Sequence, residues 1–113
     1  MKAAVVGVGH LGRHHARILA SLPGVTLAGV VDIDAGRAAE IAREYGSVAY
    51  ADARQIDGLE LAVIAAPTES HAALALPQLE SGVHTLVEKP VTQTLEEADA
   101  LIAAARRSGA VLA

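Results

Sequence analysis

The sequence contains no cysteine, no phenylalanine and no tryptophan. The absence of cysteine excludes disulfide bonds and thiol chemistry. Without these aromatic residues the core must be packed with alanine and branched aliphatic side chains, and hydrophobic residues still make up 52% of the chain, enough for a core. We expect one domain over residues 1–113, because that length is typical of a single domain.

The sequence also lacks a run of basic residues, and its formal net charge is -4. This balance disfavours nucleic acid and anionic membranes as partners. The apolar start is too short for a signal peptide and is interrupted by His10. No segment is long enough to span a bilayer. We therefore expect a soluble, cytoplasmic chain with no nucleic-acid partner and no membrane partner.

Six short apolar runs alternate with helical patterns. The runs lie at 3–8, 26–31, 47–50, 61–66, 84–88 and 110–113, and the helical segments at 11–21, 35–45, 69–81 and 95–108. Most runs are continuous rather than alternating, as in parallel strands that are covered on both faces. The pattern predicts an α/β fold with a doubly wound parallel sheet, the Rossmann arrangement with strand order 3-2-1-4-5-6.

The helix boundaries have local signals. Asp34 is placed to cap the second helix, and the residues from Thr94 to Glu97 predict a capping box for the fourth, which Gly109 ends. Pro77 should kink the third segment or split it in two. The stretch 51–59 is either a short helix or a loop.

A glycine motif, G-x-G-x-x-G, joins the first strand to the first helix at Gly7, Gly9 and Gly12. In such a motif the first glycine permits a tight turn, the second lets the backbone approach a pyrophosphate, and the third lets helix and strand pack closely. The start of the helix also offers free N–H groups and a positive dipole end to phosphates. The motif predicts a dinucleotide site.

Asp32 ends the second strand about 20 residues after the glycine motif, the spacing that ribose recognition requires. A carboxylate there accepts hydrogen bonds from the ribose hydroxyls and repels a 2′-phosphate, which favours NAD over NADP. The competing interpretation, a glycine turn with a helix-capping aspartate, does not explain the full context. Arg37 could lie near the adenine, but a solvated helix arginine is the favoured interpretation.

Five histidines raise the question of a metal. His10 and His14 are four residues apart and could share a zinc ion. We expect no metal site, because no third ligand is evident and the phosphate loop already occupies the helix start. His14 and His15 are expected on a polar or half-buried helix flank, and His84 is expected to be structural. His71 opens a helix at the crevice edge, where a functional role and a structural one are equally open.

The glycine motif, Asp32, "APTESH" at 66–71 and "VEKPV" at 87–91 occur in this order over the whole chain. On these motifs the sequence resembles the N-terminal NAD-binding domain of the Gfo/Idh/MocA oxidoreductases. The stretches "GVGHLGRHHARIL" and "LVEKPVTQTLEEADALI" are most similar to a branch of sugar-nucleotide dehydrogenases that act at the 3-hydroxyl of UDP-N-acetylglucosamine. The resemblance implies hydride transfer between NAD and a secondary hydroxyl of a sugar, polyol or sugar nucleotide.

The resemblance also implies a role for individual residues. The implied contacts are the backbone of Gly9, His10 and Leu11 at the pyrophosphate, Asp32 at the adenosine ribose, Ala66, Pro67 and Thr68 along the nicotinamide half with His71 nearby, and Glu88 at the nicotinamide ribose. Lys89 would point at the substrate hydroxyl, and its bond to Pro90 is often cis in this family.

A lysine at the end of a buried strand needs a partner or a task, because a charge removed from water is costly. An ammonium beside the substrate would stabilise a developing alkoxide and, in the reverse direction, polarise a carbonyl. Pro90 would fix the turn that aims Lys89, and Glu88 would supply the compensating charge. The alternative is an ordinary surface lysine.

Family members carry a second domain that binds the substrate, and no such domain is expected within these 113 residues. The chain alone is therefore expected to be inactive and, through exposed apolar surface, to self-associate as a homo-oligomer. Two other functions stay open. A stand-alone nucleotide-binding or sensing module of the CoA-binding kind suits the length, but not Asp32. A non-catalytic assembly subunit does not explain why every cofactor motif is present.

Overall fold

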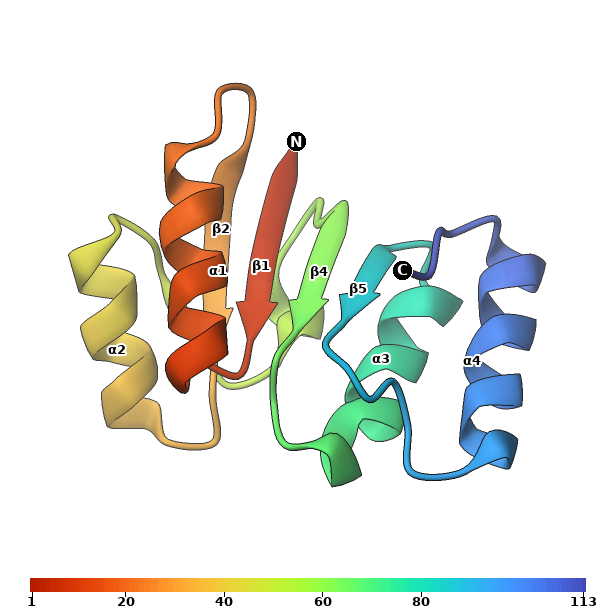
Figure 1. Cartoon of the computed structure of the whole chain (residues 1–113). Coiled ribbons are helices and arrows are strands. Elements are labelled where there is room, and N and C mark those ends of the chain that lie inside the picture. The colour runs from red at the N-terminus through yellow and green to blue at the C-terminus, as the bar shows by residue number, and fades with distance from the viewer.

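The computed structural model describes all 113 residues and contains one parallel sheet of five strands (Figure 1). The strands are β1 (Lys2–Val6), β2 (Thr26–Val31), β3 (Ala49–Tyr50), β4 (Leu61–Ile64) and β5 (His84–Val87). Their order is β3-β2-β1-β4-β5. The predicted doubly wound order is confirmed for these five strands.

The sixth predicted strand is reduced to a single bridge. Leu112 pairs in parallel with Thr85 beside β5, the position that the predicted order requires. The backbone hydrogen bonds involve only Val111 and Ala113 on this side of β5. The prediction of a strand over 110–113 is therefore wrong. A strand needs successive residues that pair with a neighbouring strand, and this segment forms a single bridge.

Four helices connect the strands: α1 (His10–Ser21), α2 (Ala35–Glu44), α3 (His71–Glu80) and α4 (Leu95–Ser108), with short 3₁₀ turns η1 (Ala53–Gln55) and η2 (Thr68–Ser70). Asp34 caps α2 as predicted, because its Oδ1 accepts from Arg37 N–H at 3.0 Å. Only half of the predicted capping box forms on α4. Thr94 accepts from Glu97 N–H, whereas the Glu97 carboxylate accepts from Gln93 N–H rather than from Thr94.

Pro77 lies inside α3, which continues to Glu80 without a break. The predicted split is therefore wrong. A proline removes one backbone hydrogen bond from a helix, but packing outweighs that loss here, because Gln78 and Leu79 after it are buried. The helix ends as expected near Gly82, which has a positive φ of 80°.

The sheet has a separate hydrophobic core on each face. Helices α1 and α2 pack over one face around Ala16, Ile41, Val5 and Val30. Helices α3 and α4 cover the other face, where Ile64, Leu79 and Leu101 are fully buried. Figure 1 shows this division, with α1 and α2 beside β1 and β2 and the other two helices beside β4 and β5. Small alanines at these positions let the helices lie close to the sheet, in agreement with the composition.

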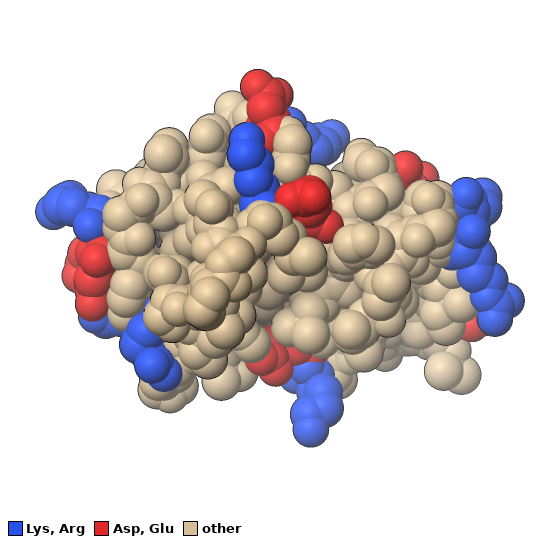
Figure 2. Space-filling model, turned by 90° about the horizontal axis from the view of Figure 1, so that it is seen from above, with Lys and Arg blue, Asp and Glu red and all other residues tan.

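Figure 2 views the molecule from the amino ends of the strands, and most of this face is uncharged. Lysine, arginine, aspartate and glutamate side chains stand singly or beside the opposite sign, without a broad basic patch. None of the helices combines the length and the apolar character that crossing a membrane would require.

Candidate functional site

The loops that follow β1, β2, β4 and β5 meet at the carboxyl edge of the sheet, at the bottom of Figure 1. This is the edge where doubly wound folds bind ligands, at the point where the strand order reverses. An open groove of about 570 Å³ lies here. Of the predicted cofactor residues, the groove is lined by Gly7, Gly9, His10, Leu11, Asp32, Ala66 and Pro67.

Two of the three glycines are required by close packing within the chain. Gly7 has a φ of +92°, and a Cβ placed on it would lie 2.6 Å from the backbone nitrogen of Ala66. A Cβ on Gly12 would lie 1.7 Å from the carbonyl oxygen of Gly7. Both distances are far below van der Waals contact. These residues therefore fix the tight turn and the approach of α1 to β1, as the motif predicts.

Gly9 differs from the other two, because a Cβ there would meet nothing within 4 Å. Gly9 is the N-cap of α1, and no side chain caps this helix. The N–H groups of His10, Leu11 and Gly12 find no acceptor within the chain. Open space above free N–H groups at a helix start fits a phosphate. This part of the groove therefore fits the pyrophosphate of a dinucleotide.

Asp32 ties the glycine loop to the end of β2. Its Oδ2 accepts from Val8 N–H at 2.8 Å, and its Oδ1 accepts from Asp34 N–H at 2.9 Å. Each carboxylate oxygen can accept further hydrogen bonds, and Asp32 is only half-buried and lines the groove. The carboxylate is thus held in one orientation while it stays available to a ribose.

Arg37 lines the same groove and also a neighbouring hollow beside Gly9 and His10. No hydrogen bond or ion pair holds its guanidinium within the chain. Sequence reasoning favoured a solvated helix arginine, and the structure places this residue next to the proposed ribose position. A cation there is available to an anionic or aromatic group of a ligand.

His71 is 1% exposed and joins two loops of the site. Its Nε2 lies 2.7 Å from the carbonyl oxygen of Ala66, and its Nδ1 lies 2.9 Å from that of Pro90 and 3.1 Å from that of Val91. Since both ring nitrogens face backbone carbonyls, the imidazole has no nitrogen left for a ligand. A role of His71 in cofactor binding would therefore act through the position of the two loops.

Glu88 and Lys89 follow β5 directly. The N–H of Glu88 donates to the carbonyl of Ile64 at 3.0 Å, which extends the pairing with β4 by one residue. Lys89 is exposed, its ammonium has no hydrogen-bond or ion-pair partner, and its peptide bond to Pro90 is cis. The free ammonium thus stands at the same edge as the groove.

The Glu88 side chain is not free, because it forms an ion-pair hydrogen bond with Nε2 of His15 on α1. The hydrogen bond from His15 holds the pKa of the Glu88 carboxyl below its ordinary value, and the backbone N–H and the charge of Lys89 act in the same direction. Sequence analysis placed His15 on a half-buried helix flank and missed this partner. No local signal could reveal it, because the two residues are 73 positions apart.

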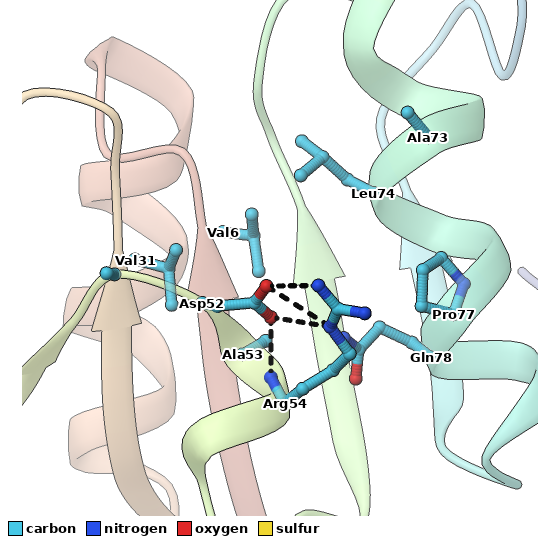
Figure 3. Close-up of a pocket in the computed structure, with 10 residues that line it drawn as sticks. Val6, Val31, Asp52, Ala53, Arg54, Ala73, Leu74, Pro77 and Gln78 are labelled. Carbon is cyan, nitrogen blue, oxygen red and sulfur yellow. Dashed lines mark hydrogen bonds and ion pairs between the residues drawn. The ribbon is translucent and has the colours of Figure 1, made fainter.

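A second hollow of about 190 Å³ lies between η1 and α3 (Figure 3). Val6 and Val31, the last residues of β1 and β2, form its inner wall, and the Asp52–Arg54 ion pair stands at its side. None of the predicted cofactor residues lines it. It is therefore separate from the groove over the glycine loop.

The histidines of α1 do not gather into a metal site. The His10 and His14 rings pack edge to face with centroids 5.0 Å apart. No group of three histidine, cysteine, aspartate or glutamate side chains could hold a metal ion. His84, on β5, accepts a hydrogen bond from Val111 N–H through Nδ1, which matches the structural role expected for it.

A family model for oxidoreductases with an NAD-binding Rossmann fold matches residues 1–113, the whole chain. The chain belongs to the Gfo/Idh/MocA oxidoreductase family. The five-stranded order described above is consistent with the NAD-binding Rossmann fold that this family model describes.

Several proteins to which this chain is similar are dehydrogenases. UDP-N-acetylglucosamine 3-dehydrogenase of Acidithiobacillus ferrooxidans is 45% identical, over 100% of this chain and 36% of that protein. The scyllo-inositol 2-dehydrogenase (NAD(+)) of Bacillus subtilis is 33% identical, over 98% of this chain and 34% of that protein. GenD2 from gentamicin A biosynthesis, solved with NAD, superposes with a TM-score of 0.95 at 34% identity, over 100% of this chain and 33% of its own. The chain spans about a third of each relative.

Proposed function

We propose that this chain is the cofactor-binding part of an NAD-dependent dehydrogenase that transfers hydride between NAD and a secondary hydroxyl. The observation that carries the proposal is the convergence at one sheet edge of an uncapped glycine loop, an oriented carboxylate and an unpaired lysine. The first two suit the phosphates and ribose of a dinucleotide. The third suits an oxygen that gains negative charge during the reaction.

The preference for NAD over NADP is carried by Asp32. A 2′-phosphate would have to sit beside a carboxylate that is fixed by two backbone N–H groups, and that repulsion disfavours NADP. Arg37 lies on the same groove and would attract the phosphate. The carboxylate should dominate, because its position is fixed by hydrogen bonds whereas the guanidinium of Arg37 is held by none.

When bound in the groove, NAD would supply the hydride acceptor for oxidation of the substrate, and NADH the donor for the reverse direction. The chain supplies the charge at the substrate oxygen. Lys89 would stabilise an alkoxide as its proton leaves, and it would polarise a carbonyl in the reverse direction. Glu88, ionised and adjacent, would balance the ammonium and accept a hydrogen bond from the nicotinamide ribose. Ala66, Pro67 and Thr68, on the loop after β4, would line the nicotinamide half.

The proposed substrate is a sugar, polyol or sugar nucleotide, because the matched relatives are named for UDP-N-acetylglucosamine and inositols. Identity is highest, among these, to the UDP-N-acetylglucosamine 3-dehydrogenase. Substrate contacts would come from protein outside these 113 residues, so we propose that the isolated chain binds cofactor without turning over substrate.

Calorimetric titration of the chain with NADH and NADPH at one salt concentration tests the cofactor proposal. We expect NADH to bind and NADPH to bind clearly more weakly. Equal affinity would contradict the role of Asp32. If the chain is folded and binds neither nucleotide, the dinucleotide site is contradicted. CoA would then be titrated, because the alternative of a stand-alone CoA-binding module requires CoA to bind.

The catalytic proposal is tested in a chimera in which this chain replaces the corresponding part of the A. ferrooxidans enzyme. We expect NADH formation with UDP-N-acetylglucosamine, and Lys89→Ala should lower turnover by about a hundredfold or more with little change in NAD affinity. Arg43→Ala, which removes an exposed charge from α2, is the matched control. A loss confined to NAD affinity would mean that Lys89 has a different task.

We also propose that the chain self-associates through α1. Leu11 and Ile18, seven residues apart on one face of this helix, and Leu22 directly after it are 44–52% exposed. Leu61 and Leu86 are only half-buried on the same side of the sheet. Sedimentation or light scattering should show a dimer or larger species that Ile18→Glu disperses. A monomer at all concentrations would contradict this proposal.

A further inference from the structure

The His15–Glu88 pair joins α1 to the loop after β5, and no other side-chain hydrogen bond connects these two elements. His15 lies in the second turn of α1, the helix whose start carries the free N–H groups. Glu88 lies directly after β5 and beside Lys89. The other side-chain hydrogen bonds of α1 go to Glu44 on α2 or stay within α1. The pair is thus the one polar link from the phosphate end to the β5 end.

The geometry leaves one side of the Glu88 carboxylate free. Nε2 of His15 bonds to Oε1, and Oε2 accepts no well-formed hydrogen bond within the chain, although the Lys89 N–H lies close enough to the carboxylate to help lower its pKa. The backbone of Glu88 is fixed separately, by its N–H bond to Ile64. Both side chains are about a quarter exposed, at 26% for His15 and 25% for Glu88. The carboxylate is therefore anchored at its backbone and at one oxygen, while the second oxygen remains available.

We propose that His15 is a positioning residue, which holds the Glu88 carboxylate so that its free oxygen accepts a hydroxyl of the second ribose of the dinucleotide. This inference rests on the proposed function, since it requires a dinucleotide in the groove. A carboxylate with several rotamers loses freedom when it binds a ligand, and a residue that removes that freedom beforehand raises affinity. His15 would thus act on the cofactor without touching it.

The alternative is that the pair only joins α1 to the sheet. In that case its loss would lower stability and would weaken all nucleotides alike. The positioning role makes a different prediction, because only ligands with a second ribose would be affected. ADP contains the adenosine ribose and both phosphates but lacks the second ribose, whereas ADP-ribose and NAD contain it.

The test compares His15→Asn with His15→Gln by calorimetric titration of NAD, ADP-ribose and ADP. The glutamine amide nitrogen occupies about the place of Nε2, whereas that of asparagine is one carbon too short to reach Glu88. We expect His15→Asn to weaken NAD and ADP-ribose about tenfold, the effect of losing one hydrogen bond to a charged group, and to leave ADP within about twofold. His15→Gln should restore most of the loss. In a Glu88→Gln background, His15→Asn should have no further effect.

His14→Gln is the matched control, because His14 is an exposed neighbour on α1 that contacts Arg17 and the His10 ring but not Glu88. It should leave all three affinities unchanged. If His15→Asn weakened the binding of ADP and NAD equally, or weakened neither, the positioning role would be overturned. NAD binding by the wild type would in that case still support the dinucleotide site. Failure of the folded wild type to bind NAD would overturn both.

Discussion

The proposed cofactor groove has a proposed phosphate end and a proposed nicotinamide end, and these two ends are built in different ways. The phosphate end is one continuous stretch, from Gly7 to Gly12, and its shape follows from backbone sterics. The nicotinamide end is assembled from α1, the loop after β4 and the loop after β5, which are joined through histidine side chains. A local motif is therefore enough to recognise the first end, whereas the second end exists only once the sheet has formed.

The difference extends to how each end tolerates change. A glycine that is required by a close approach cannot be replaced, because any side chain collides with backbone. A histidine that links two loops can be replaced at the cost of its hydrogen bonds, since the strands still place the loops near each other. Substitutions at the phosphate end should therefore act mainly through steric overlap. Substitutions at the nicotinamide end should act mainly through lost hydrogen bonds.

The largest effect is expected for Gly12→Ala. Its Cβ would lie 1.7 Å from the carbonyl oxygen of Gly7, so α1 must shift, which should lower the free energy of unfolding by about 3 kcal/mol. Gly9→Ala is the matched control, because a Cβ there meets nothing. It should change stability by less than about 0.5 kcal/mol while its methyl group obstructs the phosphates and weakens NAD. Urea unfolding and titration measure the two effects. Equal destabilisation by both would contradict the steric account.

The next largest effect is expected for His71→Ala, at the other end of the groove. It removes the buried ring that lies between the carbonyls of Ala66 and Pro90, and the lost hydrogen bond and the cavity left behind should together cost about 2 kcal/mol of unfolding free energy. His84→Ala, which removes an exposed histidine with one hydrogen bond, should cost about 0.5 kcal/mol. Denaturant unfolding measures both. If the two variants were equally stable, His71 would not be the link between the loops.

A smaller effect is expected at Asp32, between the two ends. Asp32→Ser removes the charge that opposes a 2′-phosphate and leaves Arg37 beside it, so the preference for NADH over NADPH should fall about tenfold. Adding Arg37→Ala should remove the gain in NADPH affinity. ADP measured in parallel reports any loosening of the glycine loop, since Asp32 also accepts from Val8 N–H. An unchanged preference would show that selectivity resides elsewhere.

The smallest effect concerns pH and the His15–Glu88 pair. The folded-state pKa of Glu88 is lowered, first by the hydrogen bond from His15. Its carboxylate therefore adds stability above the ordinary glutamate pKa of about 4.3, and this contribution disappears as the pH falls through the folded-state pKa. Wild type should exceed Glu88→Gln by less than about 1 kcal/mol at pH 5.

The advantage of wild type over Glu88→Gln should decrease as the pH is lowered from about 5 to about 3, because the lowered folded-state pKa is approached and the carboxylate is progressively protonated. Thermal unfolding between these two pH values measures it. Glu80→Gln, which alters an exposed carboxylate without a hydrogen-bond partner, should show no such trend. A difference from wild type that is constant over this pH range would mean that the pair is not ionic.

Much of the fold was predictable, because its signals are local. The continuous apolar runs indicated buried parallel strands, and the caps at Asp34 and Gly109 marked helix ends within one residue. The errors arose where packing decided between local options. Pro77 does not split α3, since buried residues continue on both sides, and the run at 110–113 pairs at Leu112 alone.

The residues proposed for the site divide in the same way, into those with local signals and those without. The glycine loop and Asp32 could be recognised from spacing, since ribose and pyrophosphate impose fixed distances along one strand–helix unit. The loops from 66 to 71 and from 88 to 90 were recognised by family resemblance rather than by physics. The hydrogen bond between His15 and Glu88 could not be foreseen, because nothing in the neighbourhood of either residue indicates a partner 73 positions away.

The sequence by itself determined the strand–helix alternation, the strand order and the tight packing of the glycine loop. These depend on hydrophobic period, glycine placement and short-range backbone geometry, which are properties of neighbouring residues. Only the tertiary structure decided that His71 is buried between two loops and that His15 holds Glu88. Such contacts depend on where distant strands end in space, and a residue's partner there is set by the packing of helices on the sheet.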